Sequence, residues 1–274
     1  MAVIEVEGAL LHVEETGSGP TALVLHGGLG LDHTMYRTLD PLGERLRLVF
    51  VDHRCNGRST GDLETATMER WAADVAEVAG ALAPGEQVIV IGHSYGGFIA
   101  QEAMISHPER IGATVLLTTT PGQLADGEEP VPEGPPIPAE FAALLARPPE
   151  DDEELAASMS QLALAYLHRA PVDVLRSAMA GTEFRAAAMA RGLEVLSTWS
   201  SVERLASVAM PVLVVAGRHD AFTAWPQSDR IARRLRDAEV VVLEHSGHFP
   251  WLDEPEVFFP AVTGWMERRG LLGR

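Results

Sequence analysis

The chain has 274 residues, of which 46% are hydrophobic and 22% charged, enough apolar side chain to bury one sizeable core. Its formal net charge is −18, and all 21 basic residues are arginines. Chemistry that needs a lysine amine, such as a Schiff base or a P-loop, is therefore excluded. The acidity also argues against nucleic acid or an anionic membrane as partner, because both bind basic surfaces.

The cysteine content, the first residues and the hydropathy of the chain all favour a cytoplasmic protein. The single cysteine, Cys55, excludes an internal disulfide. Residues 1–7 carry two glutamates and no basic residue, unlike a signal peptide. No apolar stretch approaches the ~20 residues that a membrane span needs. The sequence thus predicts a soluble cytoplasmic protein, monomeric or homo-oligomeric, that acts on a small molecule or short peptide and has no nucleic-acid or membrane partner.

Short aliphatic runs alternate with helical patterns along the chain. Strands are expected at residues 3–6, 10–13, 21–25, 48–52, 88–91, 114–117, 212–216 and 240–243, and helices at 68–83, 96–107, 227–235 and 255–268. From residue 48 onward the strands are almost wholly apolar, which is typical of parallel strands buried on both faces. The first two alternate in polarity and predict an antiparallel hairpin at one edge. The order predicts an α/β fold with a doubly wound, mostly parallel eight-stranded sheet.

One interval, between Thr120 and Val208, interrupts this alternation. Residues 130–149 contain seven prolines and are expected to be irregular. Helical patterns follow at 151–169, 172–180 and 182–198. We therefore expect a core of residues 1–120 and 208–274 with a helical cap, residues 121–207, inserted into it. An independent second domain is the alternative, but short helices of this kind need the sheet to complete their core.

Polar residues follow the carboxyl ends of the later strands, where reacting groups collect in a parallel sheet. Gly92-x-Ser94-x-Gly96 comes directly after an apolar strand and before a helix, which is the setting of a nucleophile elbow. Side chains at positions 92 and 96 would collide with the neighbouring strand and helix. Ser94 is the candidate nucleophile, and an ordinary glycine-rich turn is the alternative.

A serine hydroxyl needs a base within hydrogen-bond reach. His248, in the loop after the last strand, is the candidate base. Asp220, which closes the seventh strand, is the candidate acid that holds the imidazole in one tautomer. Asp253 and Glu254 compete with Asp220 by their closeness to His248 in the sequence.

The same chemistry needs donors aimed at an oxyanion. The backbone N–H groups of Tyr95 and Gly28 are the candidates. His245 and His248 could imitate a metal pair, but no further ligands at suitable spacing accompany them, so no metal site is predicted. No cofactor is expected, because no G-x-G-x-x-G follows a strand.

Four motifs in this order resemble the α/β-hydrolase superfamily over nearly the whole chain outside the cap. They are His26-Gly27-Gly28-Leu29-Gly30, Asp52-His53-Arg54-Cys55-Asn56-Gly57-Arg58-Ser59, Gly92-His93-Ser94-Tyr95-Gly96-Gly97 and Ser246-Gly247-His248-Phe249. The double glycine and the Asp-x-Arg-x-x-Gly-x-Ser stretch resemble the proline iminopeptidase-related branch. That branch removes N-terminal proline from peptides and binds the free amine with cap carboxylates.

Three features depart from that branch. Leu29 stands where such peptidases usually carry proline, and Tyr95 stands where they usually carry tryptophan. Their cap signature with its amine-binding glutamate is missing, and Glu183 and Glu194 are the nearest candidates.

The function predicted is hydrolysis of a small-molecule ester, lactone or amide through an acyl-enzyme on Ser94. Residues expected to line the substrate site are Gly27, Leu29, Trp199, Phe222, Trp225 and Phe249. Three alternatives stay open: a proline iminopeptidase-type aminopeptidase, a receptor-like ligand-binding protein, and a perhydrolase or carbon–carbon bond hydrolase of the same fold. Serine at position 94 disfavours the members with an aspartate nucleophile, epoxide hydrolases and haloalkane dehalogenases.

Overall fold

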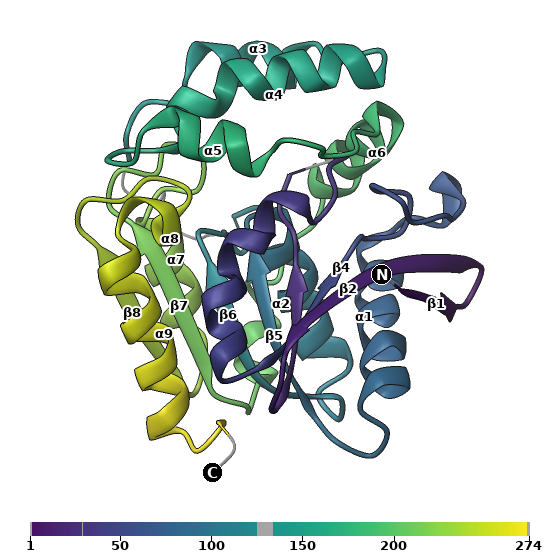
Figure 1. The fold of residues 1–274 in the computed structure, drawn as a ribbon, viewed down its shortest axis with the longest axis vertical. Coiled ribbons are helices and arrows are strands. Elements are labelled where there is room, and N and C mark those ends of the chain that lie inside the picture. Colours follow the sequence, from purple (N-terminus) through teal and green to yellow (C-terminus); the bar gives the residue numbers. More distant parts are fainter. Residues whose placement is uncertain (1, 29, 125–133, 273–274) are drawn as a thin grey trace.

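The computed structural model describes residues 2–28, 30–124 and 134–272. An eight-stranded sheet runs through its centre in the order β1-β2-β4-β3-β5-β6-β7-β8 (Figure 1). The strands are β1 (Ala2–Val6), β2 (Ala9–Gly17), β3 (Thr21–Leu25), β4 (Arg47–Val51), β5 (Val88–His93), β6 (Ile111–Leu117), β7 (Val212–Gly217) and β8 (Ala238–Leu243). Strand β2 pairs antiparallel with β1 and β4, and the pairings from β4 to β8 are parallel. The predicted fold class and edge hairpin are confirmed.

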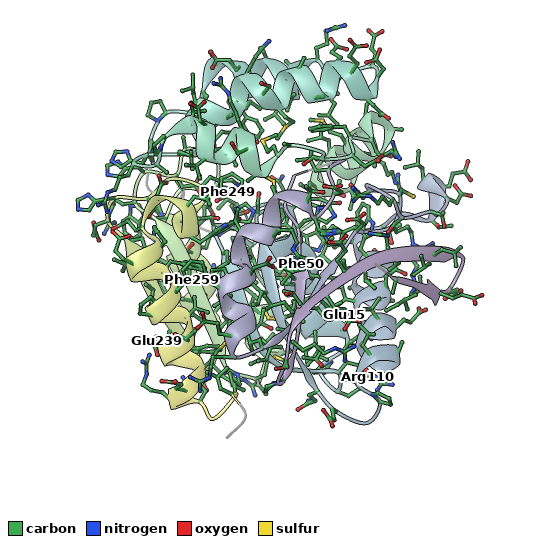
Figure 2. The ribbon with its side chains drawn as sticks, in the orientation of Figure 1. Glu15, Phe50, Arg110, Glu239, Phe249 and Phe259 are labelled. Atoms are coloured by element: carbon green, nitrogen blue, oxygen red, sulfur yellow. The ribbon has the colours of Figure 1, made fainter. Side chains whose placement is uncertain are left out.

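The continuous apolar strands are explained by helices on both faces of the sheet. On one face pack α1 (Met68–Leu82), α2 (Tyr95–Ser106) and α7 (Pro226–Ala232), and on the other η1 (Thr34–Glu44), α8 (Pro250–Asp253) and α9 (Pro255–Arg268). Alternate residues of each strand enter the two cores; in β4, Val49 faces α1 and α2, whereas Phe50 faces η1. Figure 2 shows Phe50 in the interior of the molecule and the charged Glu239 and Arg110 at its margin.

Between β6 and β7, the residues that the structure describes form four α-helices: α3 (Ala139–Ala146), α4 (Asp152–Tyr166), α5 (Val172–Ala178) and α6 (Ala186–Leu196). They cover one end of the sheet, at the top of Figure 1. At the start of α4 the Asp151 side chain accepts a hydrogen bond from the N–H of Glu154 at 2.8 Å. Two 3-10 turns, η2 (Leu63–Thr65) and η3 (Leu205–Ser207), complete the elements.

Two helical segments differ from the sequence prediction. Helix α3 lies inside residues 130–149, which were expected to be irregular, because its eight residues fit between Pro138 and Pro148 and Pro138 serves as N-cap. The 3-10 segment η1 was not predicted, since Pro41 interrupts its pattern; it buries Tyr36, Leu39 and Leu42. Within the described residues, no helix combines the length and the hydropathy needed to cross a membrane.

Candidate active site

Ser94 occupies a strained turn between β5 and α2. Its φ of 50° and ψ of −113° lie in a region that non-glycine residues rarely adopt. A Cβ on Gly92 would stand 2.5 Å from the carbonyl oxygen of Gly96, and one on Gly96 would stand 2.1 Å from that of Leu25 in β3. Both glycines are therefore required by the close approach of helix and strand, and the turn has the form of a nucleophile elbow.

Hydrogen bonds hold this turn from both sides. The Ser94 N–H donates to the carbonyl of Leu117 at 3.0 Å. The Ser94 carbonyl accepts from the N–H of Gly97 at 3.0 Å and from the hydroxyl of Thr119 at 2.8 Å. The strained conformation is thus fixed by β6 and the loop that follows it, and the side chain stands at the N-terminus of α2, where negative charge is favoured.

His248 and Asp220 form a buried pair beyond β8 and β7. Nδ1 of His248 lies 2.9 Å from Oδ2 of Asp220. Because a carboxylate only accepts, Nδ1 carries the proton, and Nε2 is left with the lone pair that a general base needs. The hydroxyl of Thr223 donates to the same carboxylate oxygen at 2.5 Å.

The Asp220 carboxylate is held in its ionised form. Burial alone would raise its pKa, but the charge of His248, hydrogen bonds from His248 and Thr223 and the backbone N–H of Phe222 lower the pKa below its ordinary value. The N–H groups of Phe222 and Thr223 donate to Oδ1 at 2.8 and 3.1 Å. The carboxylate therefore stays charged and can stabilise an imidazolium at His248.

The main chain of His248 is fixed at both its polar groups. Its N–H donates to the carbonyl of Tyr166, at the end of α4, at 2.7 Å. Its carbonyl accepts from the hydroxyl of Thr118 and from Nε2 of His93, both at 2.9 Å. The loop that carries the candidate base is therefore anchored to the sheet and to the helical segment above it.

A second chain of hydrogen bonds joins this loop to the one after β3. Because Nε2 of His93 donates to His248, its Nδ1 is an acceptor and takes the hydroxyl proton of Tyr36 at 2.6 Å. The Tyr36 oxygen in turn accepts from the N–H of Gly27 at 2.6 Å. Burial and the nearby His248 hold the pKa of His93 well below its usual range, so this ring is neutral.

Removing the Tyr36 hydroxyl is expected to destabilise the protein. Tyr36→Phe leaves the Gly27 N–H and Nδ1 of His93 buried without partners, at a cost of about 1–3 kcal/mol for each group. We expect a fall of several degrees in the melting temperature, measured by thermal unfolding. Tyr95→Phe is the matched control, because the Tyr95 hydroxyl is buried and already lacks a partner in the structure. An equal effect of the two substitutions would contradict the assigned network.

The two residues predicted to supply the oxyanion donors border the same cavity. Gly28, with φ of 69°, and Tyr95 both line the cavity that also contains Ser94 and His248. The neighbouring N–H of Gly27 is already used by Tyr36. A Cβ on Gly27 would lie 2.6 Å from Nδ1 of His93, so glycine is needed there for packing.

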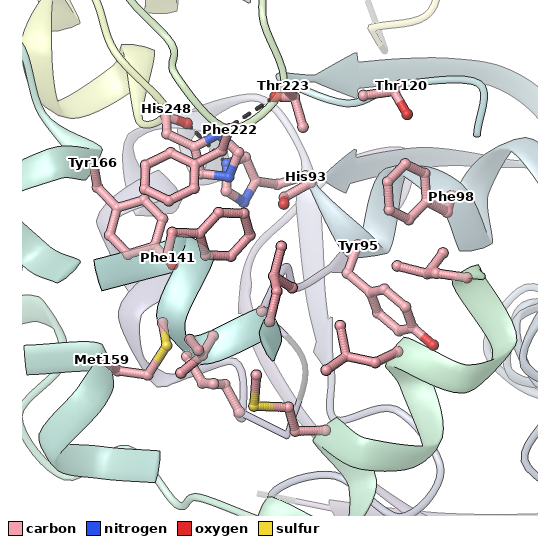
Figure 3. A pocket seen from close by; sticks show the side chains of 18 of the residues that line it. His93, Tyr95, Phe98, Thr120, Phe141, Met159, Tyr166, Phe222, Thr223 and His248 are labelled. Atoms are coloured by element: carbon pink, nitrogen blue, oxygen red, sulfur yellow. Dashed lines mark hydrogen bonds between the residues drawn. The ribbon is translucent and has the colours of Figure 1, made fainter. Parts of the chain in front are cut away.

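A cavity of about 410 Å³ opens above these residues. Its wall is mainly apolar and includes side chains from α3, α4 and α6, among them Leu144, Met159, Met189 and Leu193. Figure 3 shows the rings of Phe141, Tyr166 and Phe222 on the side of the cavity next to His248. No aspartate, glutamate or arginine lines it within the part of the chain that the structure describes. The space suits an uncharged, apolar molecule.

Comparisons with known proteins decide the family. The model of the alpha/beta hydrolase family matches residues 22–261. The chain belongs to this family. The hydrolase is 28% identical to a pimeloyl-[acyl-carrier protein] methyl ester esterase of Nitrosomonas europaea, over 91% of this chain and 97% of the other. It is 24% identical to the proline iminopeptidase PfmaB of Pestalotiopsis fici, over 97% and 99%. Among solved structures, an esterase from Exiguobacterium antarcticum has a TM-score of 0.79 at 20% identity, with 96% and 97% covered.

The predicted lining residues of the hydrolase fall into two groups. Phe222 and Phe249 line the cavity. Trp199 does not: its indole N–H donates to Glu102 at 2.8 Å, and the residue borders a separate polar groove beside α6. Trp225 also lies outside the lining, beneath the guanidinium of Arg218 at 4.5 Å. Gly27 is turned to Tyr36 rather than to the cavity, and Leu29 lies outside the described residues.

The other carboxylates considered in the sequence analysis bind neighbouring groups of the protein and do not belong to the candidate triad. Asp253 accepts from the N–H groups of His168, Arg169, Ala170 and Gly247. Glu254 accepts from the N–H of His245 and the hydroxyl of Ser246. Glu183 pairs with Arg185 and Glu194 with Arg191, and neither lines the cavity of the hydrolase.

Sequence reasoning missed three residues of this site: Tyr36, Thr223 and His93. His93 and Thr223 lie within three residues of the predicted Ser94 and Asp220, so their positions carried a signal. Tyr36 carried none, since it comes from η1 and reaches the site only in the folded chain.

Proposed function

We propose that the chain is a serine esterase for small esters with an apolar acyl group, with Ser94 as nucleophile, His248 as general base and Asp220 as the orienting acid. One observation carries the proposal: the strained serine and the Asp220-bound imidazole border one apolar cavity that no charged side chain among the described residues lines. Acyl transfer needs this combination of nucleophile, base and water-excluding space.

The chemistry follows from the positions of these groups. Oγ of Ser94 attacks the ester carbonyl while Nε2 of His248 takes its proton. The N–H groups of Gly28 and Tyr95 stabilise the negative charge that develops on the carbonyl oxygen. The C–O bond to the leaving alcohol breaks as His248 returns the proton to it. A water molecule, deprotonated by His248, then attacks the acyl-enzyme and releases the acid and free Ser94.

In this proposal residues 121–207 act as a cap, and the cap selects which acyl groups the enzyme accepts. Apolar side chains of α3, α4 and α6 make up the far wall, which favours an aliphatic or aromatic acyl chain. The similarity to methyl ester esterases supports a small alcohol as leaving group. An aminopeptidase would need an anion for the substrate's ammonium group, and Glu183 and Glu194 do not line the cavity.

Two chromogenic substrates separate ester from amine chemistry. We expect release of p-nitrophenol from short and medium-chain p-nitrophenyl esters. Release of p-nitroaniline from a prolyl p-nitroanilide is expected to be at least about 100-fold slower, because its cationic amine would have to enter an uncharged cavity. Efficient cleavage of the anilide would contradict the proposal and favour the peptidase. Turnover of neither substrate would favour a binding protein.

A further inference from the structure

A second cluster of side chains that could bind a ligand lies outside the cavity, on β2 and at the start of η1. His12 and Glu14 are alternate residues of β2, so their side chains leave the same face of the strand. His33 reaches them from the residue before η1. One ring nitrogen of each histidine and one carboxylate oxygen of Glu14 lie within 4.8 Å of one another.

His12 lacks the partner that a buried polar group normally has. The residue is 8% exposed, and its Nε2 is buried without a hydrogen bond in the structure. The ring stacks against His33, with centroids 5.7 Å apart and planes 19° apart, and this contact satisfies no polar atom. An unpaired buried nitrogen costs free energy and calls for a ligand.

The surroundings of His33 resemble those of a metal-binding histidine. Its Nδ1 lies 2.5 Å from Oδ1 of Asp52, which also accepts from the His33 N–H at 3.0 Å. Asp52 is in turn held by the N–H of Arg58 at 3.0 Å. A carboxylate on the far nitrogen fixes the ring and turns the other nitrogen toward a metal, as outer-shell partners of zinc ligands do.

The distance between His33 and Glu14 matches the edge of a tetrahedral site. Nε2 of His33 lies 3.4 Å from Oε2 of Glu14, and metal–ligand bonds of 2.0–2.1 Å give a tetrahedral edge of about 3.4 Å. Two imidazoles and one carboxylate are a donor set that suits zinc. Arg37 also contacts Oε2, at 3.2 Å, and would have to move; it is paired with Asp40 as well, and its side chain is 36% exposed. The half-buried Glu14 leaves a path for entry.

We propose that His12, Glu14 and His33 bind Zn²⁺, with solvent as the remaining ligand. The bound ion would tie β2, which lies between β1 and β4, to His33 at the start of η1. Leu31 and Met35, on either side of His33, line the cavity, so the site would stabilise one of its walls. The sequence alone predicted no metal site, because the ligands come from two separate segments.

The test is titration of the chelator-treated full-length protein with Zn²⁺ alone, by calorimetry and thermal unfolding. We expect one equivalent to bind per chain and the melting temperature to rise by several degrees, because an ion that binds only the folded state stabilises it. Loss of an outer-shell partner typically weakens metal binding by roughly 10-fold or more. Because His12 and Glu14 are proposed as direct ligands, His12→Asn and Glu14→Gln are each expected to weaken Zn²⁺ binding by at least that factor. Co²⁺ in place of Zn²⁺ is expected to give the visible absorption of a tetrahedral site.

An exposed histidine pair supplies the matched control. His168 and His219 stack with ring centroids 3.6 Å apart and could themselves bind Zn²⁺ at the surface. The double variant His168→Asn/His219→Asn should keep the stoichiometric binding. Absence of Zn²⁺ binding to the wild type would overturn the proposal, as would binding that survives His12→Asn and Glu14→Gln but disappears in the double variant.

Discussion

Ser94→Ala is expected to reduce kcat for p-nitrophenyl esters by roughly 10⁴-fold or more, to the residual level that oriented binding alone provides. The loss follows because Ser94 is the proposed nucleophile, and the nearby hydroxyls of Thr118, Thr119 and Thr223 already donate to a carbonyl or to Asp220. The fold should survive, since the hydrogen bonds that hold the turn come from the Ser94 backbone.

Purified wild type and variant are compared by initial rates and by thermal unfolding. Ser106→Ala is the control, because Ser106 lies at the other end of α2 and its hydroxyl donates to Glu102 at 2.9 Å. We expect it to keep nearly full activity. If Ser94→Ala retained more than about one hundredth of wild-type kcat with an intact fold, Ser94 would not be the nucleophile.

Asp220→Asn is expected to lower kcat by about 10³–10⁴-fold, the loss typical of the orienting acid in serine hydrolases. The amide removes the negative charge that stabilises the His248 imidazolium, and it can turn an NH₂ group toward Nδ1. The ring would then hold its proton on Nε2, where it cannot take one from Ser94.

The dependence of wild-type activity on pH tests the roles proposed for His248 and Asp220. Acidification should reduce kcat/KM because an imidazolium at His248 cannot accept a proton. The pKa of Asp220 is lowered, by the charge and hydrogen bond of His248, although its burial opposes the shift. Asp220 therefore stays ionised in mildly acidic solution, and its protonation does not account for the loss of activity. An activity that is flat from about pH 5 to 8 would contradict this role.

Asp253→Asn distinguishes Asp220 from its competitor in the sequence. Asp253 accepts backbone N–H groups from residues 168–170 and from Gly247. Its substitution should lower the melting temperature, because it anchors the loops around His248, and change kcat far less than Asp220→Asn. The reverse order of effects on kcat would assign the acid to Asp253.

Local patterns were sufficient to predict the sheet and the elbow. Strands such as β3 and β7 are continuous aliphatic runs, so their length and burial could be predicted without tertiary information. The glycines around Ser94 are part of a motif that can be recognised in the sequence. The structure explains why they are needed: a Cβ on Gly96 would lie 2.1 Å from the Leu25 carbonyl oxygen, and one on Gly92 would lie 2.5 Å from that of Gly96. The contact between His248 and Asp220 follows from adjacent strand ends in a parallel sheet.

The cavity wall could not be predicted in this way. Phe222, Phe249 and Trp199 were all predicted as aromatic wall residues; Phe222 and Phe249, which lie close to Asp220 and His248 in the sequence, line the cavity, whereas Trp199 does not. Its indole instead fills a position beside Glu102, a partner 97 residues away. Met159 and Leu144 occupy ordinary apolar helix positions, and only the tertiary packing of α3 and α4 brings them to the cavity that Ser94 also lines.

The central claim is tested most directly by covalent labelling with a fluorophosphonate, which reacts with activated serines. Because the chain has no lysine, trypsin releases residues 71–110 as one peptide that contains Ser94 and Ser106. The proposal predicts one label per chain on Ser94, placed by fragment masses, with labelling slowed by an ester substrate. Stoichiometric label on any other residue, or none on a folded protein, would contradict it.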